Sequence, residues 1–160
     1  MSARARKTWQ EKLASSNGLP KTVPIPAAMS RRQGAGTMVV PAPIEVDAAM
    51  RAVPKGRLTT INQIRARLAR QHKATVCCPL TAGIFSWIAA HAAEEAAAAG
   101  RKRITPWWRT LKSGGELNPK YPGGGALQAA RLRSEGFALE PVKGRKPARV
   151  QEHEKFLMKD

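Results

Sequence analysis

The stretch Thr105-Pro106-Trp107-Trp108-Arg109 is followed in the chain by the glycine run 123–125 and by the pair Glu135-Gly136. Proline restricts the backbone near the start of the first stretch, which indicates a loop rather than a helix. Residues 126–135 are mainly helix formers, and Gly136 suits the position after the last turn of a helix. We therefore expect a loop with two adjacent tryptophans, followed by a short helix that faces inward with Leu127, Ala130 and Leu132.

A capping-box pattern marks the start of another helix upstream. Thr60 and Gln63 are spaced so that the threonine side chain accepts a hydrogen bond from the amide of residue 63 while the glutamine reaches back. The apolar residues that follow fall on one helix face, at Ile61, Ile64 and Leu68. The pattern predicts a helix over 60–71, and a less regular apolar spacing predicts one over 44–53.

A longer apolar stripe predicts a helix over 79–99. Large side chains recur along one of its faces, which we expect to lie in the core, at Leu80, Ile84, Trp87, Ile88 and His91. Gly100 suits the end of this helix, and the basic run 101–103 complements the negative end of the helix dipole. With the helix over 60–71 and the connector 72–78, it forms a predicted helix-turn-helix unit.

The segment after the long helix predicts a β-wing. Residues 104–111 read as extended, 112–116 as a turn, and Leu117 resumes the extended chain. We therefore expect a mostly α fold with a small β-wing, arranged as a winged helix-turn-helix, over residues 43–140.

Basic extensions flank this domain. Residues 1–42 form an arm rich in proline and glycine, with a short helix around Trp9 and Leu13 and an edge strand at 37–40. Residues 141–160 form a basic tail that ends in a short helix over 150–158. The arm over residues 1–42 either follows the phosphates of a nucleic acid or keeps the protein soluble.

The chain of 160 residues has a net charge of +17, which exceeds what solubility requires and favours a polyanionic partner. Residues 41–140 alone carry 15 basic and 7 acidic residues. No apolar run reaches the length of a membrane span. We expect a cytoplasmic, nucleoid-associated monomer without a membrane partner. An alternative interpretation is a ribosome- or nucleoid-associated architectural protein that binds nucleic acid regardless of sequence.

Two motifs carry a resemblance to a known family. The stretch Pro54-Lys55-Gly56-Arg57-Leu58-Thr59-Thr60-Ile61-Asn62-Gln63-Ile64 is similar to the pattern Pro-x-Gly-x-Val-x-Thr-Tyr-Gly-Gln-Ile of O6-alkylguanine-DNA alkyltransferases. The active-site loop of that family reads Pro-Cys-His-Arg where this chain has residues 106–109. Over residues 41–140 the chain resembles the DNA-binding domain of the family. Trp107 in place of the alkyl-accepting cysteine makes it closer to the alkyltransferase-like branch, which binds alkylated DNA without repairing it directly.

The resemblance implies a lost active site at Trp107, Trp108 and Glu135, which match the family's cysteine, histidine and glutamate. Indole is only a hydrogen-bond donor and has no basic nitrogen. We therefore expect no enzyme activity and no cofactor; the partners implied are duplex DNA, possibly alkylated, and other repair proteins. The two tryptophans either stack on a flipped base or fill the former pocket.

We predict a DNA-binding set, which combines positions of the family's motifs with basic residues expected to touch phosphates, namely Thr60, Ile61, Arg65, Arg67, Arg70, Leu80, Thr81, Arg109, Lys112 and Ser113. Ile61 replaces the family's tyrosine, which presses on the phosphate beside the flipped nucleotide. Pro79 or Leu80 lies where the family has an arginine finger. Leu80 either acts as an apolar wedge or belongs to the core. Arg109 is either a DNA contact or a buried structural residue.

Cys77 and Cys78 are the only cysteines, so a disulfide framework is not indicated. One interpretation is a displaced nucleophile at a helix N-terminus, where the thiol pKa falls. A second is zinc with His72 and His91, although the spacing matches no standard finger. A third is two small residues in a turn. We expect no metal.

Overall fold

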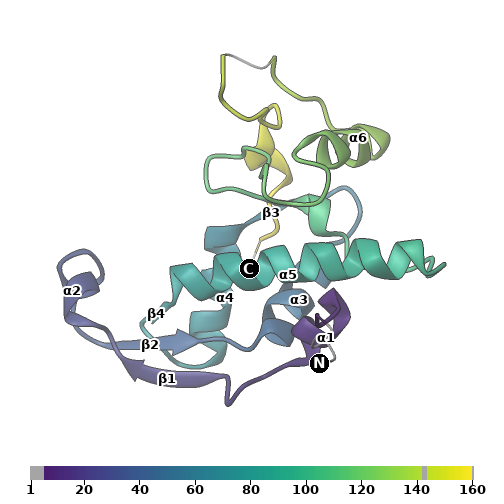
Figure 1. The fold of residues 1–160 in the computed structure, drawn as a ribbon. Coiled ribbons are helices and arrows are strands. Elements are labelled where there is room, and N and C mark those ends of the chain that lie inside the picture. The colour runs from purple at the N-terminus through teal and green to yellow at the C-terminus, as the bar shows by residue number, and fades with distance from the viewer. Residues whose placement is uncertain (1–5, 142–143, 160) are drawn as a thin grey trace.

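Helix α5, Pro79–Ala98, is the longest element of the fold, and most other elements pack around it (Figure 1). The structure is a computed structural model that describes residues 6–141 and 144–159. In chain order the elements are α1 (Trp9–Ala14), β1 (Lys21–Pro24), α2 (Ala27–Gln33), β2 (Thr37–Val40), α3 (Pro43–Arg51), β3 (Thr59–Thr60), α4 (Ile61–Gln71), β4 (Val76–Cys77), α5, η1 (Trp107–Arg109), β5 (Thr110–Leu111), α6 (Ala126–Ser134) and η2 (His153–Phe156). The expectation of a mostly helical fold with small β-elements is confirmed.

Two small sheets tie distant parts of the chain together. In the first sheet, β1 pairs antiparallel with β2, and β2 pairs parallel with β4. The predicted edge strand at 37–40 is therefore the central strand, because a second strand forms within the arm and β4 pairs on the other side. In the second sheet, β3 pairs parallel with β5 and places Thr60 beside Leu111. This pairing joins the start of α4 to the end of the tryptophan loop.

The inner face of α5 consists of small residues. Its fully buried side chains include Ala82, Ala89 and Ala90, and this face packs against α3 and η1. The predicted core stripe is wrong at its first two positions, since Leu80 is 71% and Ile84 is 42% exposed. Close packing of helices leaves room only for short side chains where the backbones approach, so the alanines take the inner face.

The arm covers the middle of the large-residue stripe. Trp9 of α1 stacks on His91 with ring centroids 4.5 Å apart and meets Trp87 edge-on at 4.8 Å. The backbone N–H groups of Trp9 and Gln10 both donate to the Glu95 carboxylate, at 3.1 and 3.0 Å. The predicted short helix of the arm is confirmed, and it is part of the packed structure.

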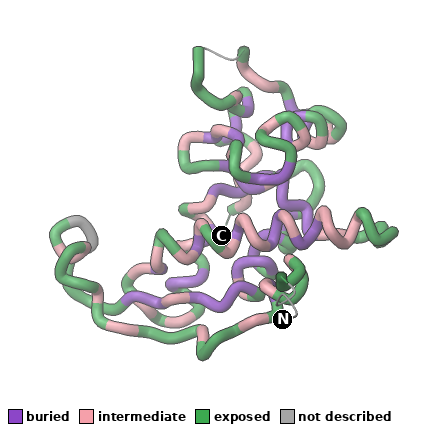
Figure 2. Tube along the Cα trace, in the orientation of Figure 1, coloured by how far each residue is buried: buried purple, intermediate pink, exposed green. Residues whose placement is uncertain are grey.

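The C-terminal segment also lies on the domain (Figure 2). Val150 and His153 are buried, and the backbone of Leu58 exchanges hydrogen bonds with Phe156 and Met158, each 2.8 Å long. Residues 144–159 therefore do not project as a tail, although the three-part domain division stays a prediction. The predicted final helix is limited to the four residues of η2.

The predicted wing is replaced by pairing with the C-terminus. A hydrogen bond of 2.9 Å from the Lys112 amide to the Glu116 carbonyl closes the expected turn. The amide of Leu117 then donates to the Ala148 carbonyl at 2.8 Å, so the chain after the turn pairs with the C-terminal segment instead of returning along residues 104–111.

The buried face of α6 differs in part from the predicted one. Gln128, Ala129 and Leu132 are the buried residues of α6, whereas Ala130, expected inside, is exposed. Among the residues that the structure describes, no helix combines the length and the hydropathy of a membrane span.

Candidate nucleic-acid interface

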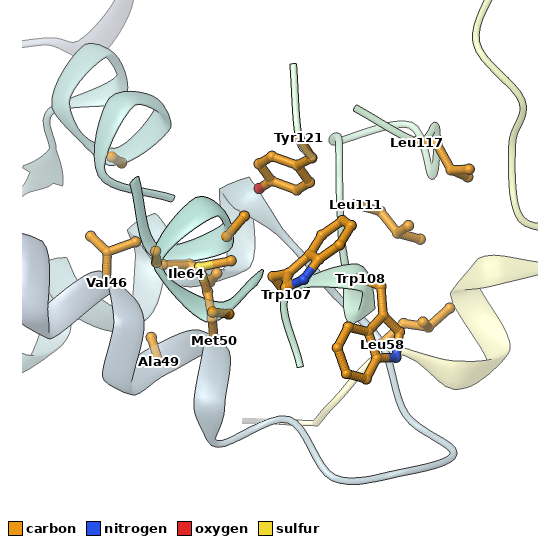
Figure 3. Packing of buried hydrophobic residues seen from close by; sticks show 14 of the residues in the cluster. Val46, Ala49, Met50, Leu58, Ile64, Trp107, Trp108, Leu111, Leu117 and Tyr121 are labelled. Atoms are coloured by element: carbon orange, nitrogen blue, oxygen red, sulfur yellow. The ribbon is translucent and has the colours of Figure 1, made fainter. Parts of the chain in front are cut away.

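Trp107 is enclosed by the core. It is 0% exposed, and its indole N–H donates to Oε1 of Glu94 at 2.9 Å. Its ring meets those of Trp108 and Tyr121 edge to face, with centroids 5.9 and 5.7 Å apart (Figure 3). With its faces covered, Trp107 offers no surface for a base to stack on in this conformation. Of the two interpretations of this residue, the geometry favours the filled pocket.

Tyr121 closes the same region from the loop that precedes α6. Its hydroxyl donates to Oγ of Ser86 on α5 at 3.2 Å, and that serine donates to the Gly83 carbonyl at 2.8 Å. Burial raises the pKa of Tyr121 to about 12, so the phenol stays protonated and keeps donating. Sequence reasoning missed Tyr121, Ser86 and Glu94. No spacing in the sequence links these three residues to Trp107.

Trp108 lies at the edge of the core rather than within it. It is 9% exposed, and the guanidinium groups of Arg131 and Arg109 lie 4.6 and 5.6 Å from its ring centroid. Its indole N–H is buried without a partner in hydrogen-bond geometry, although it is close enough to the Glu135 carboxylate to help lower the pKa of that group. Trp108 forms part of the wall of an open cavity of about 650 Å³.

Arg109 and Glu135 form a bidentate ion pair. Nε and Nη2 of Arg109 donate to the two carboxylate oxygens at 2.9 and 2.6 Å, and Nη1 donates to the Val53 carbonyl at 2.8 Å. Burial raises the pKa of Glu135, but the hydrogen bonds from Arg109, the nearby indole N–H of Trp108 and the charges of Arg109 and Lys55 outweigh it, so the pKa falls below its usual range. Of the two interpretations of Arg109, the geometry favours the buried structural residue, because its guanidinium is committed to these contacts.

At the start of α4, two predicted DNA-binding residues have structural roles. Thr60 is buried as the N-cap and accepts from the Gln63 amide at 3.2 Å, as predicted. The Gln63 side chain does not complete the capping box, since it binds Thr59 and Met158 instead. Arg65 donates twice to the Cys77 carbonyl, at 3.1 and 2.9 Å, and so joins α4 to β4 while remaining half-buried.

The rest of the predicted DNA-binding set lies at the surface or partly so. The exposed members are Arg67, Arg70, Leu80, Lys112 and Ser113, and the half-buried ones are Ile61 and Thr81. Leu80 and Thr81 lie on the first turn of α5, whereas Arg67 of α4 lines a hollow with Ala49 of α3 and with Met158. Lys112 and Ser113 belong to a separate turn.

Leu80 is exposed on the first turn of α5, and Ile84 lies one turn further along. The interpretation of Leu80 as a core residue is therefore wrong. A large apolar side chain at the open end of a helix is the geometry that an intercalating wedge requires. The interpretation of Leu80 as a wedge therefore stays a prediction.

The cysteines and histidines lie in separate environments. Burial raises the pKa of Cys77 to about 11, which disfavours the thiolate that a nucleophile requires. Cys78 is half-buried at the N-cap of α5. His72 pairs with Glu45, whereas His91 stacks on Trp9. Within residues 6–141 and 144–159, no three His, Cys, Asp or Glu side chains are grouped to hold a metal.

Comparison with known proteins identifies the fold. The chain is similar to S. pombe Atl1 in complex with damaged DNA containing O6-carboxymethylguanine, with 19% identity and a TM-score of 0.51 over 74% of this chain and 94% of that chain. A second structure, S. pombe ATL in complex with DNA, gives 19% identity and a TM-score of 0.50 with the same coverage. No family model and no curated protein matches the sequence. The chain thus has the fold of the alkyltransferase-like protein Atl1, as the sequence resemblance predicted.

Proposed function

We propose that this protein binds duplex DNA without covalent chemistry, recognises alkylated or otherwise damaged bases, and marks them for other repair proteins. The observation that supports this best is the likeness to S. pombe Atl1, a protein solved on damaged DNA, over 74% of this chain. In this proposal α4 and α5 act as a helix-turn-helix, and α5 is the recognition helix.

The surface around the first turn of α5 suits the backbone of a duplex. Arg67 and Arg70 on α4 expose further basic groups, and Lys112 and Ser113 supply a polar turn. Leu80 is the candidate wedge between base pairs. The net charge of +17 adds a long-range attraction for DNA that is independent of sequence.

Alkyl transfer is not part of the proposal. Trp107 occupies the position of the cysteine in the family motif, and its indole N–H is already bound to Glu94. Cys77, an alternative nucleophile, has a pKa of about 11, so its thiol is mostly protonated at neutral pH. We expect incubation with alkylated DNA to add no alkyl mass to the protein, and an adduct on Cys77 or Cys78 in a mass spectrum would overturn this.

A second candidate function has its own support. Trp107 is fully buried and Tyr121 is tied to Ser86, so a flipped base could enter this region only if these side chains moved. A protein with this fold and a closed pocket would bind DNA as an architectural protein, regardless of lesions.

One titration separates the two functions. Fluorescent duplexes that differ only in a single O6-alkylguanine would be titrated with the full chain at several salt concentrations. We expect about tenfold tighter binding to the lesion duplex, or ~1.4 kcal/mol, and a log–log salt slope of several units. Equal affinities would favour the architectural function, and a nearly flat salt dependence would remove DNA as the main partner.

A further inference from the structure

An open cavity of about 650 Å³ lies at the C-terminal end of α5, where α3, η1 and α6 meet it. Its apolar wall is formed by Ala97, Val53, Pro54, Ile104, Pro106 and Trp108. The remaining lining residues are all basic, namely Arg51, Arg101, Lys102, Arg103, Arg109 and Arg131. Cations that are distant in the sequence therefore converge on one hollow.

The charge in this wall is only partly compensated. Arg109 pairs with Glu135, Arg131 with Glu94, and Arg51 with Asp47. The run Arg101-Lys102-Arg103 is exposed and has no partner among the described residues. No carboxylate belongs to the described lining, so three of the six positive charges are left to attract an anion.

The ends of two helices open on this hollow. Cations at the end of a helix stabilise its negative end, which accounts for the run 101–103 after α5 and for Arg51, the last residue of α3. Arg51 is also paired with Asp47. The three exposed charges of 101–103 have no carboxylate partner in the described part of the wall, so they stay available to a ligand.

The cavity is remote from the proposed DNA surface. Leu80 and Ala97 are 17 residues apart on one helix, and a rise of 1.5 Å per residue separates them by about 26 Å. Figure 1 shows α5 extending from α4 at one end to a free end beyond α1 and below α6. One rigid helix thus connects an exposed apolar turn to a basic hollow.

We propose that this hollow is a second nucleic-acid surface, which holds the phosphate backbone of a second duplex segment and lets the protein bridge two segments. This inference depends on the proposed function for the choice of nucleic acid as ligand. The hollow is wide and open to solvent, and its uncompensated cations suit a chain of phosphates, which is bound by charge without a fitted pocket.

The test is a bridging assay with the full chain. A biotinylated duplex of about 30 base pairs on beads, roughly three helical turns, captures a fluorescent duplex of the same length only when the protein holds both. The variant Arg101→Gln/Lys102→Gln/Arg103→Gln removes three charges and keeps long side chains. The matched control, Lys21→Gln/Lys120→Gln/Lys159→Gln, removes three exposed charges that line none of the described cavities. Thermal melting would establish that both variants fold.

We expect the cavity variant to lose at least tenfold of the capture, while the control keeps at least half. Capture of the fluorescent duplex at the wild-type level by both variants, or an equal loss of capture in both, would overturn the inference. If a short acidic peptide binds the wild type but not the cavity variant, while capture of duplex is the same for both, the inference would also be overturned, since the ligand would then be a protein.

A second pair of variants separates this inference from the proposed function. Arg67→Glu/Leu80→Glu changes two proposed DNA contacts, one on α4 and one at the start of α5, and should lower the affinity for a single duplex. In that background, the binding that remains should fall further when 101–103 are neutralised, with the salt slope lowered by about 2–3 units. If Arg67→Glu/Leu80→Glu changes nothing but the cavity variant abolishes binding, the proposed function fails and the cavity surface stands. If Arg67→Glu/Leu80→Glu abolishes binding but the cavity variant changes nothing, the proposed function stands and the second surface is excluded.

Discussion

The two faces of α5 differ in a way that inverts the usual division of an amphipathic helix. The inner face is built from alanines such as Ala82, Ala89 and Ala90, which are completely buried. The outer face carries the large residues, of which Trp87 lies under the arm helix α1 and Leu80 is open to solvent. The small face sets how closely α3 and η1 approach, and the large face provides contact surface.

The size of a side chain on α5 therefore predicts poorly whether that residue belongs to the core or is available to a partner. A buried alanine contributes little apolar area, yet its neighbours depend on its small volume. An exposed leucine contributes nothing to the core, yet it is available to a partner. Substitutions on the two faces of α5 should therefore differ in their effects on stability and on DNA binding.

The largest effect is expected for Trp107→Ala, in the segment that closes the inner face. The substitution removes the largest fully buried side chain and leaves Glu94 with Arg131 alone. We expect a loss of about 3–5 kcal/mol of unfolding free energy, measured by denaturant unfolding. A loss below about 1 kcal/mol would show that Trp107 is not a core residue and would revive its role as a stacking surface.

Overfilling the inner face should cost less. Ala90→Leu places three more carbon atoms where α5 is completely buried, and we expect a loss of about 1–3 kcal/mol. Ala98→Leu on the exposed last turn of the same helix is the control and should change stability by less than about 0.5 kcal/mol. Equal costs at both positions would break the contrast between the two faces.

A smaller, pH-dependent effect on stability is expected at the ion pair between Arg109 of η1 and Glu135. The pKa of Glu135 is lowered in the folded protein, so its contribution is complete above the unfolded value of about 4.3 and is lost as the pH falls through the folded pKa. Glu135→Gln should therefore be less stable than wild type at pH 7, and the difference should vanish in acid. Glu154→Gln, at an exposed position, should show no such dependence in pH-resolved melting.

The sequence predicted local features of this fold well. The start of α4 follows from Thr60 and Gln63, whose capping hydrogen bond is present, and the end of α5 follows from Gly100. Each of these depends on neighbours in the chain or on a motif, where spacing carries the information.

The sequence could not predict which face of α5 is buried, because periodicity measures the contrast between faces and not what packs on them. The cover that α1 gives to Trp87 and the pairing of Leu117 with Ala148 are contacts between distant segments. The same holds for the candidate site. Whether Trp107 stacks or fills depends on Glu94 and Tyr121, and no spacing between these residues specifies that they meet.

The smallest effect on stability is expected for Leu80→Ala, and it is the most informative for function. Because Leu80 is 71% exposed, its truncation should change the unfolding free energy by less than about 0.5 kcal/mol. Ile44→Ala, at another exposed apolar position on α3, is the matched control and should leave both stability and DNA affinity unchanged. If Leu80 is a wedge, Leu80→Ala alone should weaken duplex binding severalfold, and Leu80→Phe should restore it, since a larger apolar side chain can also enter between base pairs. The salt slope should stay the same, because no phosphate contact is lost. Unchanged affinity in Leu80→Ala would mean that the large face of α5 is not the DNA surface at its open end.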